Sequence, residues 1–405
     1  MTVAAHIDLP PTAQAPLPDR PDTIRALQLG LSWFFEQPGG LQRYYQELLK
    51  HLPSARVSVR GLVCGTAAVE RQSCGTVRAP VRSDASLARR LTAFRRAIRR
   101  EMREFRPDVV VSHFALYAWP ALRYLKDLPL VVHFHGPWYA ESRIEGSIPL
   151  KTWAKYRIER AVYRRADCII TLSNAFKDVL INDFGVMESR IRVVPGGVDA
   201  RRFDVPQTRA EARAHFGWPQ DRRIVLSVRR LTRRMGLEQL IDAAGVVRAK
   251  IPDALFLLAG EGRRRSELRA AIDSAGLSDH VRLLGYLSDE ELPLAYRAAD
   301  LSVVPSIALE GFGLSVAESL AAGTPVVVTP VGGLPEIIRP LRNSLVSSDS
   351  SSGELARTVT AAFASPEGLP SSEECRRYAR RFDWSSIVFA IRDALCTRPT
   401  KGWTG

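Results

Sequence analysis

The order of apolar and polar positions between residues 299 and 329 predicts a parallel crossover unit. An apolar run, Leu301 to Val304, is stopped by Pro305, and a loop with two glycines follows. A helical pattern then runs from Leu314 to Ala322, with Gly323 as its left-handed C-cap. A second β-branched run covers Val326 to Thr329. Strand, loop, helix and strand in this order predict two parallel strands joined by a right-handed crossover.

The same alternation continues along the rest of the chain. Short apolar runs predict strands at Ile24–Phe35, Val57–Val63, Val109–Ser112, Leu130–Phe134, Asp167–Ser173, Ile191–Pro195, Ile224–Val228, Ala254–Ala259 and Val281–Leu287. Apolar residues at helical spacing predict helices from Leu41 onward and at Ser86–Phe105, Leu150–Arg165, Asn174–Phe184 and Ser385–Leu395. Alternating strands and helices are typical of the α/β class, and 405 residues exceed one core, so two domains are expected.

Two of the predicted helices are strongly basic. The helix at Ser86–Phe105 has one apolar stripe, made of Leu87, Leu91, Phe94, Ile98, Met102 and Phe105. Its remaining sides are crowded with arginines. In the second helix, the residues expected to point inward are Trp153, Tyr156, Ile158 and Val162. A packed helix with a solvated basic face is the ordinary interpretation, and docking on anionic lipid is the alternative.

Composition places the chain among globular proteins. With 46% hydrophobic and 25% charged residues it fits neither the disordered nor the fibrous class. The Pro-rich residues 1–22 are expected to form a disordered tail and do not match a signal peptide, and no apolar run is long enough to span a membrane. The five cysteines lack a C-x-x-C pair, which favours reduced thiols and a cytoplasmic location.

Positive charge is concentrated in the first half of the chain. Residues 1–207 contain 31 Lys and Arg against 20 Asp and Glu, about +11, whereas the remainder contains 26 against 23, about +3. This asymmetry predicts an anionic partner such as a membrane surface, a nucleic acid or a phosphorylated acceptor.

The loop at Glu310-Gly311-Phe312-Gly313 lies where a parallel sheet binds ligands, beyond the carboxyl end of a strand. Glycines let backbone N–H groups approach an anion, and the helix that begins at Leu314 adds its positive end. Glu310 would accept hydrogen bonds from sugar hydroxyls, and Glu318 would hold a diol such as a ribose. The pattern favours a phosphorylated sugar as ligand.

The stretch EGFGLSVAESLAAGTPV resembles the E-x7-E signature of family 4 glycosyltransferases, and weaker matches cover most of residues 24–396. The resemblance implies a GT-B fold, in which two Rossmann-like doubly wound parallel-sheet domains face each other across a cleft. It places an acceptor-side domain at 23–200, a nucleotide-sugar domain at 201–380, and a C-terminal helix and tail at 381–405 that cross back to the first domain. It also implies transfer with retention at the anomeric carbon.

The resemblance assigns catalytic roles to His135, Arg230 and Glu310. Arg230 falls on the family's phosphate-binding arginine, and Met235 stands where the family has a phosphate-binding lysine. Either Arg233 or Arg234 supplies that charge, or the diphosphate is bound less tightly. The donor-binding residues that it implies are Gly39, Gly40, Arg230, Arg234, Gly311, Phe312, Gly313, Leu314 and Glu318.

No metal or other cofactor is expected. The sequence has no suitably placed D-x-D pair and no evident His/Asp ligand cluster, so cations and N–H dipoles would stabilise the leaving phosphate. His113 is interpreted as a structural histidine, and Asp199, in the junction after Gly196-Gly197, as a loop cap.

The expected substrates are a UDP- or GDP-sugar, with a hexose as the transferred sugar, and a hydroxyl acceptor. One interpretation is cell-envelope polysaccharide or glycolipid assembly, with a lipid-linked acceptor and peripheral contact with the inner face of the membrane. The alternative is a small-molecule acceptor.

Three other interpretations are weaker. A phosphorylase-like enzyme would need a pyridoxal-binding lysine motif, which we do not find. A basic nucleic-acid-binding protein would need a recognition module, whereas these arginines lie on long helices, so no nucleic-acid partner is expected. An inactive relative is motivated only by Met235 and disfavoured by the intact His135, Arg230, Glu310 and Glu318.

Overall fold

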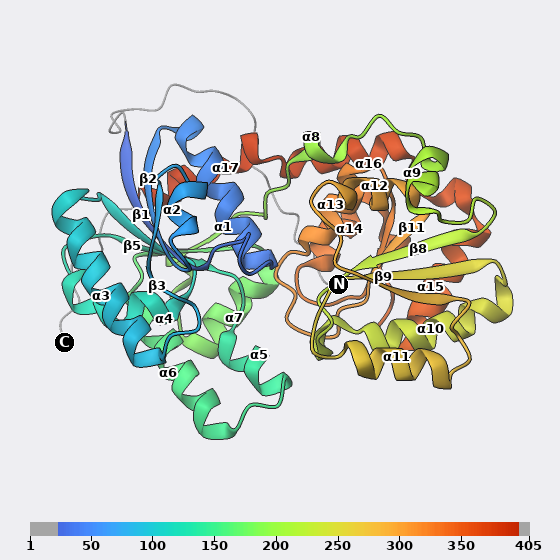
Figure 1. The fold of residues 1–405 in the computed structure, drawn as a ribbon, viewed down its shortest axis with the longest axis horizontal. Coiled ribbons are helices and arrows are strands. Elements are labelled where there is room, and N and C mark those ends of the chain that lie inside the picture. Colours follow the sequence, from blue (N-terminus) through green and yellow to red (C-terminus); the bar gives the residue numbers. More distant parts are fainter. Residues whose placement is uncertain (1–22, 397–405) are drawn as a thin grey trace. The chain divides into compact units, whose positions relative to one another are not determined.

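A computed structural model describes residues 23–396. The predicted tail at 1–22 and the end of the chain at 397–405 lie outside the described residues. The described chain forms two compact units (Figure 1). The chain passes from the first unit to the second between Gly197 and Val198, and it returns between Asp383 and Trp384. The C-terminal helix α17 (Trp384–Leu395) therefore belongs to the N-terminal unit, as the fold-class prediction requires.

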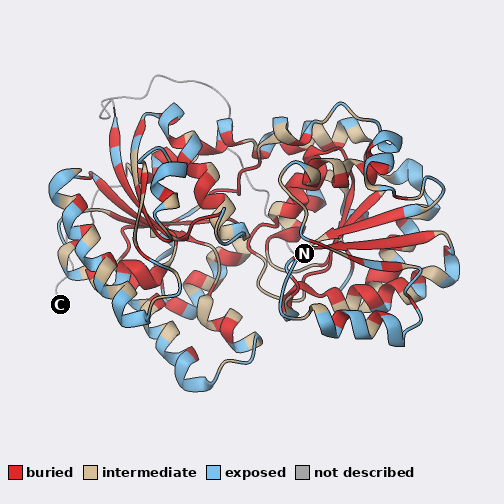
Figure 2. Cartoon of the chain, in the orientation of Figure 1, coloured by how far each residue is buried: buried red, intermediate tan, exposed pale blue. Residues whose placement is uncertain are grey.

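The N-terminal unit is built on a seven-stranded parallel sheet with the order β3-β2-β1-β4-β5-β6-β7. Its strands are β1 (Ile24–Ser32), β2 (Val57–Cys64), β3 (Val77–Val81), β4 (Val109–Ser112), β5 (Leu130–Phe134), β6 (Cys168–Thr171) and β7 (Ile191–Val193). The central strands are buried along their whole length because helices cover the sheet, which explains their near-continuous apolar sequences (Figure 2).

Seven helices lie between these strands in the described residues. They are α1 (Gly40–His51), α2 (Ala68–Gln72), α3 (Leu87–Glu104), α4 (Ala115–Ala118), α5 (Trp138–Ile144), α6 (Pro149–Arg165) and α7 (Asn174–Phe184). The sequence predicts α1, α3, α6 and α7 but not α2, α4 or α5. Short 3-10 turns lie at Leu52–Ala55, Trp119–Tyr124 and Glu188–Arg190. Helix α3 begins after Ser86, whose side chain accepts a hydrogen bond from the Arg89 amide and so caps the helix.

The burial of the two basic helices corrects part of the prediction. On α3, Phe94 and Ile98 are fully buried, but Leu87 at the start of the stripe is 49% exposed. On α6, Val162 is buried, but Trp153 is 59% exposed, so the prediction that it points inward is wrong. The buried face of α6 is set by Glu159, Val162 and Tyr163 instead, and Trp153 lies off that stripe.

Helix α17 is fixed to the N-terminal unit by Trp384. This side chain is buried, and its ring stacks on His51 with centroids 5.8 Å apart and lies 5.1 Å from the ring of Tyr44. A Cβ at Gly197 would stand 2.3 Å from the Trp384 ring, so only glycine permits this approach. Asp199 caps the short helix α8 (Ala200–Phe203) by accepting from the Arg202 amide at 3.2 Å, which confirms the predicted loop cap.

The C-terminal unit has a five-stranded parallel sheet with the order β10-β9-β8-β11-β12. Its strands are β8 (Arg223–Val228), β9 (Ala254–Ala259), β10 (Val281–Gly285), β11 (Leu301–Val304) and β12 (Val326–Val328). Its longer helices are α9 (Arg209–Phe216), α10 (Leu237–Lys250), α11 (Arg265–Ser274), α12 (Glu291–Ala298), α13 (Leu314–Ala321), α14 (Leu334–Arg342), α15 (Ser352–Ala364) and α16 (Ser372–Ala379). Short 3-10 turns lie at Arg233–Met235, Asn343–Leu345, Pro366–Gly368 and Arg380–Phe382.

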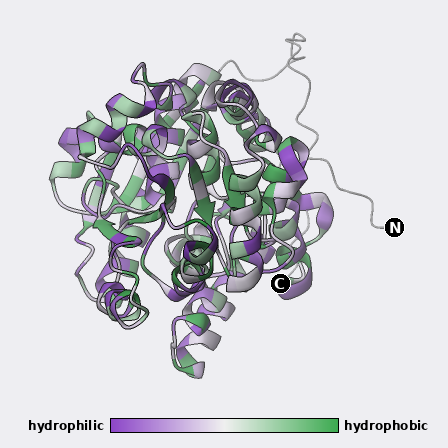
Figure 3. Ribbon diagram, turned by 90° about the vertical axis from the view of Figure 1, so that its right-hand side faces the viewer, coloured by the Kyte–Doolittle hydropathy of each residue, from purple (hydrophilic) through white to green (hydrophobic). Residues whose placement is uncertain are grey.

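Apolar residues gather on the strands and hydrophilic residues along the outer helical faces (Figure 3). Across residues 23–396, no helix combines the length and the apolar character needed to cross a membrane. All five cysteines are free thiols, as the sequence predicts.

Candidate functional site

The signature loop joins β11 to α13 at the carboxyl end of the C-terminal sheet. Its backbone is packed against a second loop, because the Gly333 amide donates to the Glu310 carbonyl at 2.9 Å. A Cβ at Gly332 would lie 1.9 Å from the same carbonyl oxygen. Leu309, just before Glu310, has φ +53°, a left-handed conformation that is strained for a leucine. The position of Glu310 is therefore fixed by its backbone surroundings.

Arg229 is the arginine that reaches Glu310. Its guanidinium is buried and forms an ion pair with the Glu310 carboxylate. The same guanidinium donates to the hydroxyls of Ser306 and of Ser315. The Ser306 hydroxyl also donates to Glu310 at 3.0 Å. Arg229 is not among the residues to which the family resemblance assigns a role.

Arg230 is exposed and takes a different direction. The Arg229 amide donates to the Ala259 carbonyl at 2.9 Å and the Leu231 amide to Glu261 at 2.9 Å, so this segment extends the pairing of β8 with β9. Successive side chains of an extended strand point to opposite faces, which sends Arg229 and Arg230 apart. The proposed phosphate-binding role of Arg230 stays a prediction.

Arg234 brings a second guanidinium to the loop. It is buried, and its Nη1 donates to the Leu309 carbonyl at 2.9 Å, while the Ile307 amide donates to the Arg234 carbonyl at 3.0 Å. Met235, which occupies the position of the family lysine, is itself buried. Of the two arginines suggested to compensate for it, Arg234 is therefore the one held at the Glu310 loop.

The two arginines determine the charge state of Glu310. Burial by itself would raise the pKa of this carboxyl group. The positive charges of Arg229 and Arg234, with the hydrogen bonds from Arg229 and Ser306, more than offset burial and hold the pKa below its ordinary value. Glu310 is therefore an ionised hydrogen-bond acceptor at neutral pH, beside two cations.

The start of α13 follows Glu310 directly. Gly313 has φ +83°, and a Cβ there would lie 2.5 Å from Leu334, so glycine is required. No side chain caps the helix, which leaves its positive end, from Leu314 onward, open to an anion. The Phe312 ring is buried, with its centroid 5.3 Å from that of Phe382, and the predicted contacts of Gly311 and Phe312 with a donor remain predictions.

Glu318 lies one turn further along α13 and is buried. The Tyr296 hydroxyl donates to its carboxylate at 3.3 Å. Glu318 is thus oriented by a buried tyrosine, and its predicted contact with a diol remains a prediction.

In the N-terminal unit, the predicted glycines precede α1. Gly39 has an extended backbone, and a Cβ there would meet the flexible side chain of Gln42, whereas a Cβ at Gly40 would meet nothing within 4 Å. Neither glycine is required by packing within its own unit. Helix α1 also begins without a side-chain cap.

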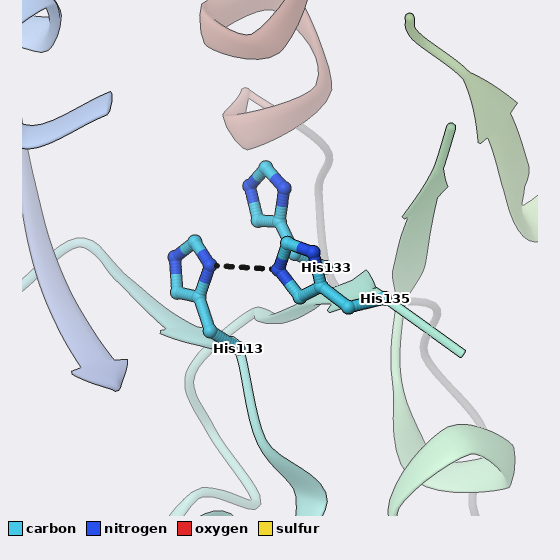
Figure 4. A group of neighbouring side chains, drawn as sticks. All are labelled: His113, His133 and His135. Atoms are coloured by element: carbon cyan, nitrogen blue, oxygen red, sulfur yellow. Dashed lines mark hydrogen bonds between the residues drawn. The ribbon is translucent and has the colours of Figure 1, made fainter. Parts of the chain in front are cut away.

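His135 directly follows β5 and is part of a cluster of three histidines (Figure 4). His135 Nε2 lies 3.3 Å from His113 Nδ1, and the rings of His113 and His133 stack with centroids 4.4 Å apart. Burial lowers the pKa of His135 to about 4 and the pKa values of His113 and His133 well below their ordinary range. All three rings are neutral at pH 7.

This cluster corrects the expectation that the chain has no metal-ligand cluster. His133 lies on β5 and His135 follows the strand directly, and a separation of two positions in an extended chain directs both side chains to one face of the sheet. His113 follows the neighbouring strand β4. The H-x-H spacing could have indicated that His133 and His135 lie together. The proximity of His113 depends on the order of the strands, which the spacing does not give.

Glu159 on α6 is a further residue that the sequence did not single out. Its buried carboxylate accepts from the amides of Trp138 at 2.8 Å and Tyr139 at 2.9 Å, and from the Tyr163 hydroxyl at 3.0 Å. These amides open α5, three residues after His135. Glu159 therefore fixes the end of the loop that follows His135. In the sequence, this role was indicated only by a charged residue on the apolar face of a helix.

We expect the contribution of Glu159 to stability to depend on pH. Burial raises the pKa of Glu159 from 4.5 to about 7, although its hydrogen bonds act in the opposite direction. Between these values the folded state binds more protons than the unfolded state, so the free energy of unfolding decreases as the pH rises. The difference approaches about 3 kcal/mol. Urea unfolding of wild type and Glu159→Gln at pH 5 and pH 8 should show the pH dependence only in the wild type.

Glu188→Gln is the matched control for this experiment. The pKa of the exposed Glu188 carboxyl is lowered by its hydrogen bond with Lys177, so its contribution has the opposite sign and is present at higher pH. An equal pH dependence in wild type and Glu159→Gln would contradict the assignment.

Two family models match this chain. The model of "Glycosyltransferase Family 4" matches residues 38–202, and that of "Glycosyl transferases group 1" matches residues 208–382. The 2-deoxystreptamine glucosyltransferase of Streptomyces kanamyceticus is 31% identical over 305 residues, which are 72% of this chain and 76% of that protein.

Of two further comparisons, one covers a shorter part of the chain and the other has lower sequence identity. The mannosylfructose-phosphate synthase of Agrobacterium fabrum is 34% identical over 57% of this chain, and the alignment spans only 53% of that protein. The crystal structure of Anabaena HepE with UDP-glucose has a TM-score of 0.76 at 22% identity, covering 92% of this chain and 99% of that one. This structural likeness shows the shared GT-B fold.

The matches cover both units and include the signature loop, Arg234 and His135. The alignment with the Streptomyces enzyme covers most of both proteins. This chain is a member of glycosyltransferase family 4.

Proposed function

We propose that this glycosyltransferase moves a hexosyl group from a nucleoside diphosphate sugar to a hydroxyl acceptor, with retention at the anomeric carbon. The observation that carries the proposal is the group formed by Arg229, Arg234 and Glu310 at the open start of α13. Two guanidinium groups against one carboxylate leave a net positive charge at the carboxyl ends of parallel strands, where such sheets bind ligands.

This charge suits a diphosphate leaving group. Cleavage of the sugar–phosphate bond builds negative charge on the leaving phosphate oxygen, and fixed cations and N–H dipoles stabilise that charge without reorganisation. The side chains of Arg229 and Arg234 and the backbone from Gly311 to Leu314 are the groups proposed for this task. No metal ion is needed for it in this scheme.

Glu310 is proposed to orient the donor sugar. Its lowered pKa keeps it ionised, so it accepts hydrogen bonds from sugar hydroxyls and does not act as an acid. One of its oxygens is already held by Arg229 and Ser306, which argues against a nucleophilic role. Retention then follows from attack on the face that the leaving phosphate vacates, with that phosphate accepting the proton of the acceptor hydroxyl. The role of His135 at the sugar stays a prediction.

A uridine diphosphate hexose is the first donor to test, with GDP-sugars as the alternative. The name of the Streptomyces relative specifies a glucosyl group, and the Anabaena neighbour is described with UDP-glucose. Both point to UDP-glucose as the first compound in a donor series.

For the acceptor, we propose a saccharide of the cell envelope or a glycolipid. The basic first half of the chain and three exposed apolar residues around the start of α6, namely Ile148, Leu150 and Trp153, support peripheral contact with an anionic membrane. The second candidate is a small polyhydroxylated molecule, because the Streptomyces relative, aligned over 72% of this chain, is named for 2-deoxystreptamine.

Glu310→Gln is expected to reduce transfer by at least about 100-fold, because a neutral amide cannot replace the ionised acceptor between two arginines. The assay measures UDP release and sugar transfer with a series of UDP- and GDP-hexoses, in the presence of a chelator. Glu267→Gln, an exposed carboxylate on α11, is the control and should retain full activity. NMR of the product should show the anomeric configuration of the donor, and an inverted product or unaffected Glu310→Gln activity would overturn the mechanism.

A further inference from the structure

The three histidines are arranged as a set of ligands. His133 lies on β5 and His135 directly follows it, and His113 follows β4, which pairs with β5 in parallel register (Figure 4). One nitrogen of each ring lies within 4.8 Å of one nitrogen of each of the others. The H-x-H pair and a third histidine from the end of the adjacent strand therefore bring three imidazole nitrogens close together.

The spacing of the ring nitrogens fits a small divalent ion. Tetrahedral zinc has Zn–N bonds of about 2.0–2.1 Å, which separate two ligand nitrogens by about 3.4 Å. His113 Nδ1 and His135 Nε2 are 3.3 Å apart. His133 Nε2 is buried and has no hydrogen-bond partner among the described residues, an arrangement that costs free energy unless a ligand satisfies the nitrogen.

The remaining ring nitrogens have partners of the kind that orient metal ligands. The Gln28 side-chain oxygen lies 2.8 Å from His113 Nε2, so it accepts that N–H and leaves Nδ1 bare. The Tyr44 hydroxyl oxygen lies 3.3 Å from His133 Nδ1, and when this nitrogen donates to it the lone pair of Nε2 is available. Hydrogen bonds of this type fix the tautomer and direction of ligating histidines.

The chemistry of the set selects the ion. All three ligands are imidazoles, and the cluster contains no carboxylate. Imidazole ligands favour Zn²⁺, Cu²⁺ or Ni²⁺ over Mg²⁺ or Ca²⁺. His113 and His133 are buried, whereas His135 is partly exposed, so a water molecule can take the fourth position on that side.

Binding requires the rings to turn. The three rings are nearly parallel, with interplanar angles of 8° between His113 and His133, 15° between His133 and His135, and 22° between His113 and His135. Because the lone pair of a ring nitrogen lies in the ring plane, rings must turn about their Cβ–Cγ bonds before all three nitrogens can point to one ion.

We propose that His113, His133 and His135 form a three-histidine binding site for a divalent transition metal ion, with Zn²⁺ as the ion that fits the ligand set. This assignment does not depend on the proposed function. One consequence does rest on it: an ion bound to His135 removes that residue from contact with a sugar, so zinc is expected to inhibit transfer and not to support it.

The test uses the full-length protein stripped of metal, without any sugar donor. Isothermal titration with Zn²⁺ alone, and optical titration with Co²⁺ alone, should show one site per chain and the visible absorption of a four-coordinate Co²⁺ ion. Cys74→Ser and Cys396→Ser are introduced throughout, so that these accessible thiols do not bind the ion. Loss of a hydrogen-bond partner of a metal ligand costs about 10- to 100-fold in affinity, and loss of a ligand itself should cost at least the upper value. We therefore expect binding to weaken by at least about 100-fold in each of the variants His113→Gln, His133→Gln and His135→Gln.

Two controls keep the result interpretable. His215→Gln removes an exposed histidine of α9 and should leave affinity unchanged. Tyr44→Phe keeps the packing of α1 and should weaken binding about 10- to 100-fold through the lost partner of His133. If His133→Gln does not fold, the partly exposed His135→Gln and Tyr44→Phe carry the test. Equal affinity in wild type and the folded cluster variants would overturn the site, whether or not the protein transfers sugar.

Discussion

Arg229→Ala is expected to lower kcat/KM for sugar transfer by about 100- to 1000-fold. The substitution removes the guanidinium that pairs with Glu310 and is bonded to Ser306 and Ser315, so one of two cations at the open start of α13 is lost. The ionised Glu310 then loses its strongest partner as well. Steady-state kinetics with the preferred donor, together with donor affinity by calorimetry, measure the effect. Arg229→Lys should recover only part of it, because an ammonium group cannot form the planar set of hydrogen bonds.

Arg230→Ala is the matched comparison. This neighbouring arginine is exposed, and its substitution leaves the Glu310 ion pair intact, so we expect less than about a 10-fold loss. A larger loss of activity in Arg230→Ala than in Arg229→Ala would contradict the assignment of Arg229. It would mean that Arg230 binds the donor phosphates, as the family resemblance implies.

Gly236→Ala is expected to destabilise the C-terminal unit by about 3 kcal/mol or more. Gly236 has φ +69°, and an added Cβ would lie 1.8 Å from the Pro305 carbonyl oxygen, which is backbone and cannot rotate away. The two loops that carry Arg234 and Glu310 would have to separate. Thermal unfolding by circular dichroism measures the loss, and hydrogen exchange of β8 and β11 identifies the unit affected.

Gly276→Ala distinguishes the two causes of that destabilisation, which are backbone strain and the clash of the added Cβ with Pro305. Gly276 has φ +63° in the same unit, but a Cβ there meets nothing within 4 Å. Its substitution should cost only the backbone strain, about 1 kcal/mol. Similar losses in both variants would mean that the close approach of Gly236 to Pro305 contributes nothing.

Local periodicity was sufficient to predict most strands of the fold, although the edge strand β3 was not predicted. The run Leu301–Val304 is β11, and Asn174–Phe184 is α7 with the predicted bounds, because each has an apolar pattern with a clear stop signal at its end. Strands covered on both faces also carry long apolar runs, which identified the parallel sheets. The two-domain fold with a returning C-terminal helix followed from the resemblance and is confirmed.

The details of the site depend on contacts that periodicity does not contain. Arg229 and Arg230 are adjacent, and only the continuation of β8 pairing beyond Val228 decides which one meets Glu310. The histidine cluster requires β4 and β5 to be neighbours. Trp153 was placed inward on hydrophobicity alone, whereas the buried face of α6 is organised by the charged Glu159.

The C-terminal unit starts and finishes at one place. Val198 and Asp383 form a parallel bridge, and the Val198 amide donates to the Phe382 carbonyl at 2.8 Å. A segment whose two ends are already joined by hydrogen bonds can be excised, circularly permuted or replaced without stretching the chain that remains. Residues 198–383 therefore form a cassette, and exchanging it between relatives would replace the unit that carries Arg229, Arg234 and Glu310 while the insertion point stays the same.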